Sequence, residues 1–315
     1  MMSRNPVTLR VREAEWLAPT LKRLVLEHAE GAVLPIAGAG AHISLTLGDG
    51  DGPRLRNSYS LVSARDDGSR YELIVRRVEG SRGGSAFVHD RLAVGSMVEA
   101  TAPHNLFPLM SHARKHLLIG GGIGITPLMA FVPALRERGA ALELHQIASV
   151  GEAPLFETML GVADAHDLFV HAGRHALDLA ALLARQPLGT HVYVCGPAAL
   201  MDRVETLAAD LGWPAGNVHR EDFGAAGGDP FTVTLAKSAI TLAVGAEQSM
   251  LEAIEAADVD ARSLCRGGVC GECITRVIDG TPEHRDHFLT EEEKASNTLV
   301  MPCVSRARGE LVLDL

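Results

Sequence analysis

Four of the five cysteines gather towards the end of the chain, at Cys265, Cys270, Cys273 and Cys303. Cysteine thiolates are the usual ligands of iron–sulfur clusters, and the ligands of one cluster must converge on a small volume. Gly267, Gly268 and Gly271 lie within the same loop. Glycine lets the backbone approach closely and turn its N–H groups toward sulfur, which tunes the reduction potential of a cluster. The loop therefore predicts a metal centre with four thiolate ligands.

The spacing of these cysteines distinguishes between kinds of metal centre. C-x4-C-x2-C followed far downstream by one more cysteine is the plant-type spacing of a two-iron, two-sulfur (2Fe–2S) cluster. A zinc ribbon normally uses two C-x2-C pairs, and a disulfide framework suits a short secreted chain rather than one of 315 residues. We therefore predict a 2Fe–2S cluster.

The first 110 residues combine strand patterns with a candidate phosphate site. Residues 42–47 and 71–78 have the partly alternating pattern of half-buried strands, and glycine- and aspartate-rich turns separate them, which predicts a small antiparallel β-barrel. The loop Gly83-Gly84-Ser85 runs into an apolar helical pattern at residues 86–92. A helix N-terminus of this kind favours an anion because its N–H groups lack partners. By itself, however, such a loop is usually a turn with an N-cap.

The next part of the chain has the alternation of a nucleotide-binding α/β domain. A buried-strand pattern at residues 116–119 is followed by the turn GGGIGITP at residues 120–127 and by a helical pattern at residues 128–138. Further strands and helices alternate after it: strands at 142–150, 167–171 and 191–194, helices at 154–160, 177–185 and 198–211. This order predicts a parallel, doubly wound sheet. The turn is not the G-x-G-x-x-G fingerprint, so the dinucleotide interpretation depends on this context.

Residues at the ends of these strands indicate which nucleotide binds. Cys195-Gly196-Pro197 follows a strand at the carboxyl edge, where open α/β sheets bind ligands. For an isolated cysteine, a small buried thiol in a turn is the favoured interpretation. Residues 148–152 contain no Arg or Lys to meet a 2′-phosphate, whereas Glu152 can accept a hydrogen bond from a ribose hydroxyl. The sequence therefore favours NADH over NADPH. Arg174, after the third strand, weighs against this inference.

Together these motifs resemble the ferredoxin reductase type of flavoprotein. Its flavin domain carries R-x-Y-S on one strand, matched here within the segment Arg56-Asn57-Ser58-Tyr59-Ser60-Leu61, and a glycine and serine loop at a helix start. The resemblance implies that Tyr59 and Ser60 flank the isoalloxazine ring, and that an arginine and the loop hold phosphate. Asn57 stands two residues before Tyr59, where the pattern has arginine. Arg56 and Asn57 therefore both stay candidates for the phosphate contact.

The same resemblance implies roles for residues of the nicotinamide domain. In that family G-G-x-G-x-T-P borders the pyrophosphate and the flavin, and C-G-P borders the nicotinamide. The matching residues here are Gly121, Gly122, Gly124, Thr126, Pro127, Cys195, Gly196 and Pro197. Phe223 matches an aromatic residue that lies against the flavin ring, although core packing is an equally good explanation for it. Cys195, Ser60 and Thr126 are the predicted catalytic residues.

Over essentially the full length, the chain resembles the phthalate dioxygenase reductase family and the related reductases of demethylating oxygenases. The family order is flavin, nicotinamide, ferredoxin, and it implies FMN as the flavin and a Rieske-type oxygenase as the electron acceptor. We expect a flavin-binding barrel at residues 1–110, an α/β NAD-binding domain at 111–225 and an α+β, β-grasp-like ferredoxin domain at 226–315. The ferredoxin part is predicted to contain a hairpin at 231–235 and 240–244, a helix at 249–257 and strands at 273–278 and 311–315.

Redox chemistry explains this combination independently of any family. A nicotinamide gives up two electrons together as hydride, a 2Fe–2S cluster takes one, and a flavin handles both. The chain contains no C-x-H…C-x2-H pattern of a Rieske centre and no candidate 2-His-1-carboxylate site, so we expect the acceptor to be a separate protein. Two alternatives from other classes are a redox-sensing iron–sulfur flavoprotein and a binding module with structural zinc.

Composition limits the partners and the compartment. The net charge is −10, the pI is about 5.8 and there is no basic run, so we expect neither nucleic acid nor an anionic membrane as a partner. Residues 117–135 lack charge over a length that could span a bilayer, but their glycines and prolines favour a strand, a turn and a helix. The N-terminus lacks the apolar core of a signal peptide, and clustered thiols suit a reducing compartment. We expect a cytoplasmic monomer.

Overall fold

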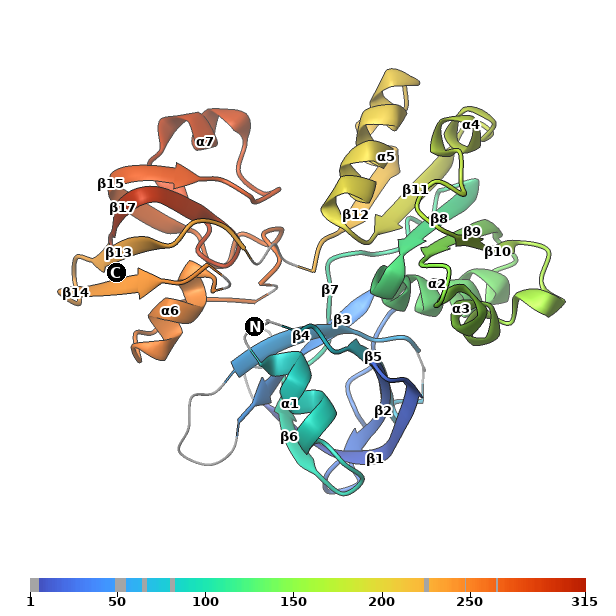
Figure 1. Ribbon diagram of the computed structural model, residues 1–315, viewed down its shortest axis with the longest axis horizontal. Coiled ribbons are helices and arrows are strands. Elements are labelled where there is room, and N and C mark those ends of the chain that lie inside the picture. Colours follow the sequence, from blue (N-terminus) through green and yellow to red (C-terminus); the bar gives the residue numbers. More distant parts are fainter. Residues whose placement is uncertain are drawn as a thin grey trace. The chain divides into compact units, whose positions relative to one another are not determined.

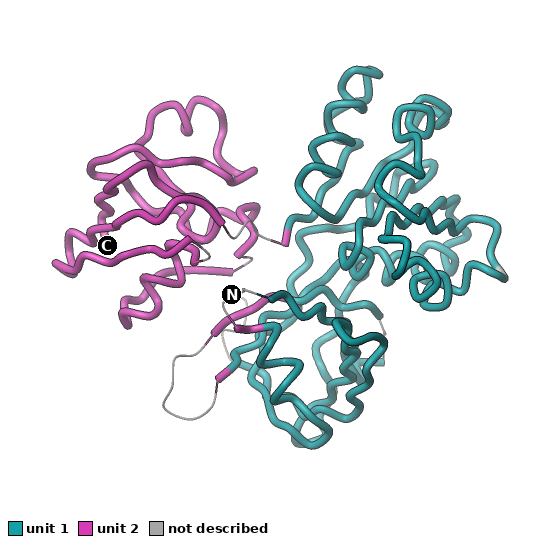
Figure 2. Tube along the Cα trace, viewed as in Figure 1, with its two compact units in different colours: residues 1–47, 59–79, 85–222 teal, residues 48–58, 80–84, 223–315 magenta. Residues whose placement is uncertain are grey.

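The computed structural model of the chain describes residues 6–48, 55–63, 67–79, 83–223, 227–246, 248–264 and 266–315. The chain divides into two compact units (Figure 2). The first consists of residues 1–47, 59–79 and 85–222, and the second of residues 48–58, 80–84 and 223–315.

The N-terminal part of the chain forms an antiparallel sheet that curves into a near-closed barrel (Figure 1). Its strands follow the order β4-β3-β6-β1-β2-β5, and β7 pairs with β3. Their bounds are Val7–Ala18 (β1), Leu21–His28 (β2), Ala41–Leu47 (β3), Leu55–Ser60 (β4), Tyr71–Arg76 (β5), Met97–Ala100 (β6) and His104–Asn105 (β7). Helix α1 (Gly84–Arg91) lies between β5 and β6 in the chain. Leu9, Leu24 and Ile43 are fully buried, because an apolar interior stabilises the barrel.

The following residues form a parallel sheet in the order β10-β9-β8-β11-β12, with helices on both faces (Figure 1). The strands are β8 (Lys115–Gly121), β9 (Ala141–Ala148), β10 (Leu168–Ala172), β11 (Thr190–Cys195) and β12 (Val218–Glu221). The helices are α2 (Ile125–Glu137), α3 (Ala153–Leu160), α4 (Leu179–Ala184) and α5 (Ala198–Asp210). Alternate residues of β8 serve different cores: Leu118 packs with α2 and α3, and Leu117 and Ile119 pack with α4 and α5.

The barrel and the parallel sheet share one apolar core within the first unit. Leu21 and Ile74 of the barrel belong to the same buried cluster as Leu118 and Phe131. Phe107, which follows β7, stacks on Phe131 with ring centroids 5.4 Å apart. These two parts are therefore held against each other by buried apolar surface.

The membrane-like stretch at residues 117–135 is a buried strand, a turn and a helix, as predicted. It covers most of β8, the 3₁₀ turn η1 (Gly122–Gly124) and most of α2. Among the helices of the described residues, none is both long enough and apolar enough to cross a membrane.

The C-terminal part of the second unit is a small α+β domain with the sheet order β14-β13-β17-β15-β16 (Figure 1). Its elements are β13 (Phe231–Leu235), β14 (Ile240–Val244), α6 (Met250–Ala256), β15 (Thr275–Glu283), α7 (Glu291–Ser296), β16 (Leu299–Val300) and β17 (Arg306–Leu313). Strands β13 and β17 run parallel, and their other neighbours are antiparallel. Ser249 and Thr290 form capping boxes that fix where α6 and α7 begin.

The predicted fold class agrees with these sheets, and the misses have identifiable causes. The sequence did not predict β1 and β2, in which charged residues interrupt the apolar alternation (VTLRVREAEWLA and LKRLVLEH). Many of these charges pair across the strands, for example Arg10 with Glu27 at 2.6 Å. Helix α7 was also missed, because its exposed sequence EEEKAS has no apolar face.

Candidate functional site

Strand β4 carries the predicted flavin residues, and the structure distinguishes Arg56 from Asn57. A Cβ atom added to Gly84, the first residue of α1, would collide with the side-chain amide of Asn57. The Arg56 side chain is 56% exposed. Successive side chains of a strand point to opposite faces. The structure therefore brings Asn57, rather than Arg56, against the start of the helix that is predicted to hold phosphate.

The loop before α1 has the backbone that the phosphate prediction requires. Gly83 has a φ of +99°, which side-chain-bearing residues rarely adopt. Ser85 is buried, and its Oγ accepts a hydrogen bond from the Val78 amide at 3.1 Å. No acidic residue lies in the first turn of α1. The N–H groups of this turn are thus presented without a competing carboxylate.

The other predicted residues of this strand differ in exposure. Tyr59 is half-buried, whereas Leu61 is buried and its amide donates to the Ala41 carbonyl at 2.8 Å. The Leu61 side chain therefore packs in the core of the barrel.

Glu221 is a functional candidate that the sequence did not single out. It ends β12, and Ser60 Oγ donates a hydrogen bond to Glu221 Oε2 at 3.3 Å. Burial raises the pKa of this carboxyl to about 8, against the smaller opposing effect of the Ser60 hydrogen bond. Glu221 therefore keeps a proton at neutral pH. The only signal in the sequence was its place at the carboxyl edge of a strand, two residues before Phe223.

Two glycine turns meet at the carboxyl ends of β8 and β11. A Cβ atom on Gly124 would collide with the Cys195 carbonyl, and one on Gly196 would lie 2.9 Å from the Gly121 Cα. A Cβ atom on Gly121 would come within 2.8 Å of the Pro197 ring. The neighbouring Gly122 has a φ of +55°. The predicted GGxGxTP and CGP motifs thus pack closely against each other, and Gly122 has open space where its Cβ would be.

Thr126 and Cys195 are placed at this surface but are not exposed reactive groups. Thr126 is buried at the start of α2, and its Oγ1 donates to the Ile123 carbonyl at 3.0 Å. Cys195 is fully buried, and burial raises the pKa of its thiol well above the ordinary value. Cys195 is therefore a neutral thiol, which shapes the site rather than acting as a nucleophile. Pro127 is buried within the first turn of α2, next to Thr126.

The structure gives Glu152 a partner that the sequence did not predict. Arg76, at the end of β5, pairs with Glu152 at 2.7 Å, and Ser149 Oγ donates to the same carboxylate at 2.9 Å. The ribose contact of Glu152 stays a prediction. Arg174 is exposed in the loop after β10. Phe223 is 50% exposed, so core packing does not explain it.

Three of the four predicted cluster ligands lie within the described residues, and Cys265 lies outside them. The sulfur atoms of Cys273 and Cys303 are 3.2 Å apart, and both residues are buried. Cys270 is half-buried in the same loop. Without Cys265, no set of three or more His, Cys, Asp or Glu side chains in the described chain is arranged as a metal site. The two converging thiols nevertheless fit a thiolate-bound cluster.

The cluster loop is held by its glycines and by one buried arginine. Gly268 and Gly271 have φ values of +76° and +75°, and a Cβ atom on Gly271 would press into the Phe288 ring. Arg266 donates two hydrogen bonds to Glu255 of α6, at 2.7 and 2.8 Å. Such a bidentate pair fixes the direction of the loop as well as its distance from the helix.

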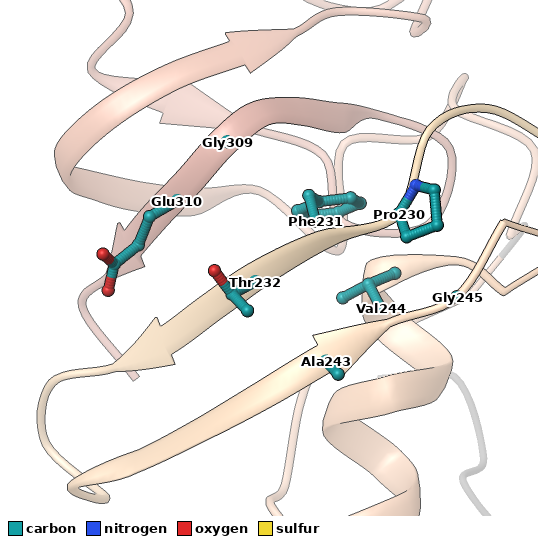
Figure 3. Close-up of a pocket in the computed structure, with 8 residues that line it drawn as sticks. All are labelled: Pro230, Phe231, Thr232, Ala243, Val244, Gly245, Gly309 and Glu310. Carbon is teal, nitrogen blue, oxygen red and sulfur yellow. The ribbon is translucent and has the colours of Figure 1, made fainter.

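A pocket of about 490 Å³ lies on the outer surface of the C-terminal domain (Figure 3). It is lined by Pro230, Phe231, Thr232, Ala243, Val244, Gly245, Gly309 and Glu310. None of these is a predicted site residue, and we assign the pocket no role.

Three features define the class of protein: a barrel with a helix N-terminus suited to phosphate, a parallel sheet with two glycine turns that face each other, and an α+β domain rich in cysteine. This is the class of nicotinamide- and flavin-dependent iron–sulfur reductases. Residues 233–308 match the model of the 2Fe-2S iron-sulfur cluster binding domain. The chain is 43% identical to the heme-dependent oxidative N-demethylase beta subunit of Ectopseudomonas mendocina, over 98% of each chain. It is 40% identical to the carnitine monooxygenase reductase subunit of Escherichia coli, again over 98% of each.

A solved structure of phthalate dioxygenase reductase, described as modular for electron transfer from pyridine nucleotides to [2Fe-2S], has the same fold. The TM-score is 0.83 at 35% identity, covering 99% of this chain and 98% of that one. The chain therefore belongs to the family of oxygenase and demethylase reductases that includes phthalate dioxygenase reductase. The predicted class of protein and its fold are confirmed.

Proposed function

We propose that this chain is the reductase component of a two-component oxygenase or demethylase system. It takes electrons from NADH and passes them, through FMN and a 2Fe–2S cluster, one at a time to a separate oxygenase. The observation that carries this proposal is the presence in one chain of all three sites: the flavin strand with its helix start, the paired glycine turns and the converging cysteines. The family relation supports the same order of electron flow.

The flavin site consists of side chains from β4 and the start of α1. Asn57 and the N–H groups of Gly84 and Ser85 would hold the FMN phosphate, and Tyr59 and Ser60 would border the ring. A flavin bound there would supply the exchange between two-electron hydride transfer and single-electron transfer. Arg56 lies 4.0 Å from the Glu255 carboxylate, and over half of its side chain is exposed.

Glu221 and Ser60 would supply the proton chemistry of this site. The carboxyl of Glu221 holds a proton at neutral pH and is hydrogen-bonded to Ser60. An uncharged carboxyl places no negative charge beside a ring that is about to gain electrons. Ser60 would position this group, because its hydroxyl donates a hydrogen bond to the Glu221 carboxyl.

The nicotinamide site is formed by the ends of β8 and β11. Gly122, which has open space at its Cβ position, would let the pyrophosphate approach the backbone before α2, and Gly121 and Gly124 would let the two turns pack closely beside it. Cys195, Gly196 and Pro197 would border the nicotinamide, with Cys195 as a compact neutral thiol. Glu152 would meet the adenosine ribose beside Arg76. Thr126, whose hydroxyl donates a hydrogen bond to the Ile123 carbonyl, would hold the turn in place.

The cluster would be held by Cys265, Cys270, Cys273 and Cys303. The buried thiols of Cys273 and Cys303 already converge, and the other two cysteines stand at the spacing that is typical of a 2Fe–2S domain. We propose a flavin domain at residues 1–110, an NAD-binding domain at 111–225 and a ferredoxin domain at 226–315. Phe223, near the end of the NAD-binding domain, would lie beside the flavin. A chain with reduced, clustered thiols suits the cytoplasm, and we propose that it acts as a monomer.

Two kinds of oxygenase are candidate partners. A Rieske-type oxygenase is the first, because it is the acceptor that the family resemblance implies. A haem-dependent demethylase is the second, because the relative with 43% identity carries that name. Neither kind of metal centre is encoded in the chain's own sequence motifs.

Reconstitution tests the proposal. Purified protein is heated to release its flavin, which should co-elute with FMN, and a stoichiometric yield of FAD would refute the flavin assignment. The intact protein is then mixed with NADH and either a Rieske-type oxygenase or a haem-dependent demethylase encoded beside its gene. Reduction of one of them, dependent on NADH and on this chain, supports the proposal. Failure to reduce any protein acceptor, with NADH oxidation intact, would instead favour the redox-sensor alternative.

A further inference from the structure

Lys22 on β2 is a buried lysine whose three ammonium donors all have partners. Its residue exposure is 5%. Nζ donates to the carbonyl oxygens of Val88 at 3.2 Å, His89 at 2.9 Å and Leu92 at 2.6 Å. An ammonium group has three donors and no acceptor, so this site matches the charged form of lysine. Lysine is almost never buried without such partners.

All three acceptors belong to the end of α1, which finishes at Arg91. The last carbonyl groups of a helix lack partners within it and carry the negative end of the helix dipole. Lys22 satisfies these carbonyls directly. The Trp16 ring supports the ammonium from 5.1 Å, and it also packs edge-on against His89 with centroids 5.0 Å apart.

The acceptors of Lys22 are neutral carbonyls, and among the described residues no carboxylate forms an ion pair with it. The nearby Asp90 pairs instead with Arg77, at 2.5 Å. The positive charge of Lys22 therefore lies at the C-terminal end of α1. The N-terminal end of this helix begins in the segment Gly83-Gly84-Ser85. A helix of eight residues is roughly 12 Å long, so Lys22 acts on the first turn by holding the opposite end of the same helix.

We propose that Lys22 is a positioning residue for the flavin phosphate. It fixes α1 by its last carbonyl groups and offsets the negative end of the helix, so that the first turn presents an uncancelled positive potential to the phosphate. This inference rests on the proposed function, in which that turn binds the phosphate of FMN. A lysine that only stabilised the barrel would affect every flavin equally, whether or not it carries phosphate.

The experiment compares FMN with riboflavin, which lacks the phosphate. Both dissociation constants are measured by fluorescence on the full chain after removal of its flavin, for the wild type and for Lys22→Met. We expect the Kd for FMN to rise roughly three- to thirtyfold, the range that charges at helix ends produce. The Kd for riboflavin should not change. Lys115→Met, which removes a lysine paired with Glu143 in the parallel sheet, is the matched control and should change neither constant.

Two further variants keep the test decisive if Lys22→Met does not fold. Lys22→Gln retains donors but loses the charge and should also weaken FMN selectively, whereas Lys22→Arg retains the charge and should restore the preference for FMN. A wild type that prefers FMN while the Met and Gln variants keep the full preference would overturn the role of Lys22 alone. If the wild type itself binds FMN and riboflavin equally, the phosphate site is absent and both proposals fail.

Discussion

Replacing Glu221 with glutamine tests whether the carboxyl of this half-buried residue keeps its proton at neutral pH. Burial raises its pKa from the ordinary value of 4.5 to about 8 in the folded chain, and in the unfolded chain it ionises near that ordinary value. Between these two pH values the folded chain holds a proton that the unfolded chain has lost. The free energy of unfolding must therefore fall as the pH rises from about 4.5 to about 8, and this contribution is constant above that.

The pKa values set the size of the effect. Each pKa unit corresponds to about 1.4 kcal/mol, so a rise from 4.5 to about 8 gives at most about 5 kcal/mol across the window. Glutamine has the same shape and does not ionise, so Glu221→Gln should lack this slope. Thermal unfolding of the flavin-loaded chain, followed by flavin fluorescence at several pH values from about 5 to about 9, measures it.

The difference between wild type and variant isolates Glu221, because every other titrating group is common to both. We expect the wild type to lose stability relative to Glu221→Gln as the pH approaches 8. Glu137→Gln, at an exposed position near the end of α2, is the matched control and should follow the wild type. A difference curve that is level, or that rises with pH, would show that the carboxyl is already ionised and would refute the reasoning.

Three further changes test the other sites. Cys303→Ser replaces a soft thiolate ligand by a weakly acidic hydroxyl, so iron content and reduction of the protein partner should fall steeply while ferricyanide reduction by NADH persists; full partner reduction without iron would contradict the role of the cluster. NADH should exceed NADPH in kcat/KM by roughly ten- to a hundredfold, since residues 148–152 after β9 contain no Arg or Lys to meet a 2′-phosphate. Equal values would implicate Arg174 or Arg76, which pairs with Glu152. Gly124→Ala should weaken NADH binding and lower the free energy of unfolding by about 1–3 kcal/mol, because the added Cβ meets the Cys195 carbonyl. The control is Gly216→Ala, which has open space at its Cβ and should change neither NADH binding nor stability.

Much of the fold could be predicted from periodicity and glycine placement. The strand at Phe231–Leu235 and its partner Ile240–Val244 have the bounds that their alternation predicts, and the helix over Ala198–Asp210 differs by one residue. These elements bury one face, and burial leaves a regular pattern in the sequence. Strand β1 leaves no such pattern, because its outward face carries charges whose partners lie on β2 and become visible only once the two strands are paired.

The candidate site likewise has features that the sequence predicts and features that it does not. Cysteine spacing and glycine turns are local patterns, so the cluster loop and the turn at Gly121–Gly124 could be found in the sequence. The contacts Ser60–Glu221, Arg76–Glu152 and Lys22–Leu92 join residues that are far apart in the chain. No local pattern predicts such pairs, and the raised pKa of Glu221 depends on burial that only the folded chain supplies.

The distribution of apolar cores fits the two kinds of electron transfer that the proposed function requires. Hydride transfer needs the reacting atoms within roughly 3–3.5 Å, so the flavin and nicotinamide sites must be held in fixed register. The shared core of Leu21, Ile74, Leu118 and Phe131 provides that rigidity, since a packed interior resists small displacements. The C-terminal domain buries a core of its own around Val233, Ile254 and Leu311. Single electrons, unlike hydride, need no direct contact between donor and acceptor atoms, and a domain that folds around its own core suits a carrier that must serve a second protein as well.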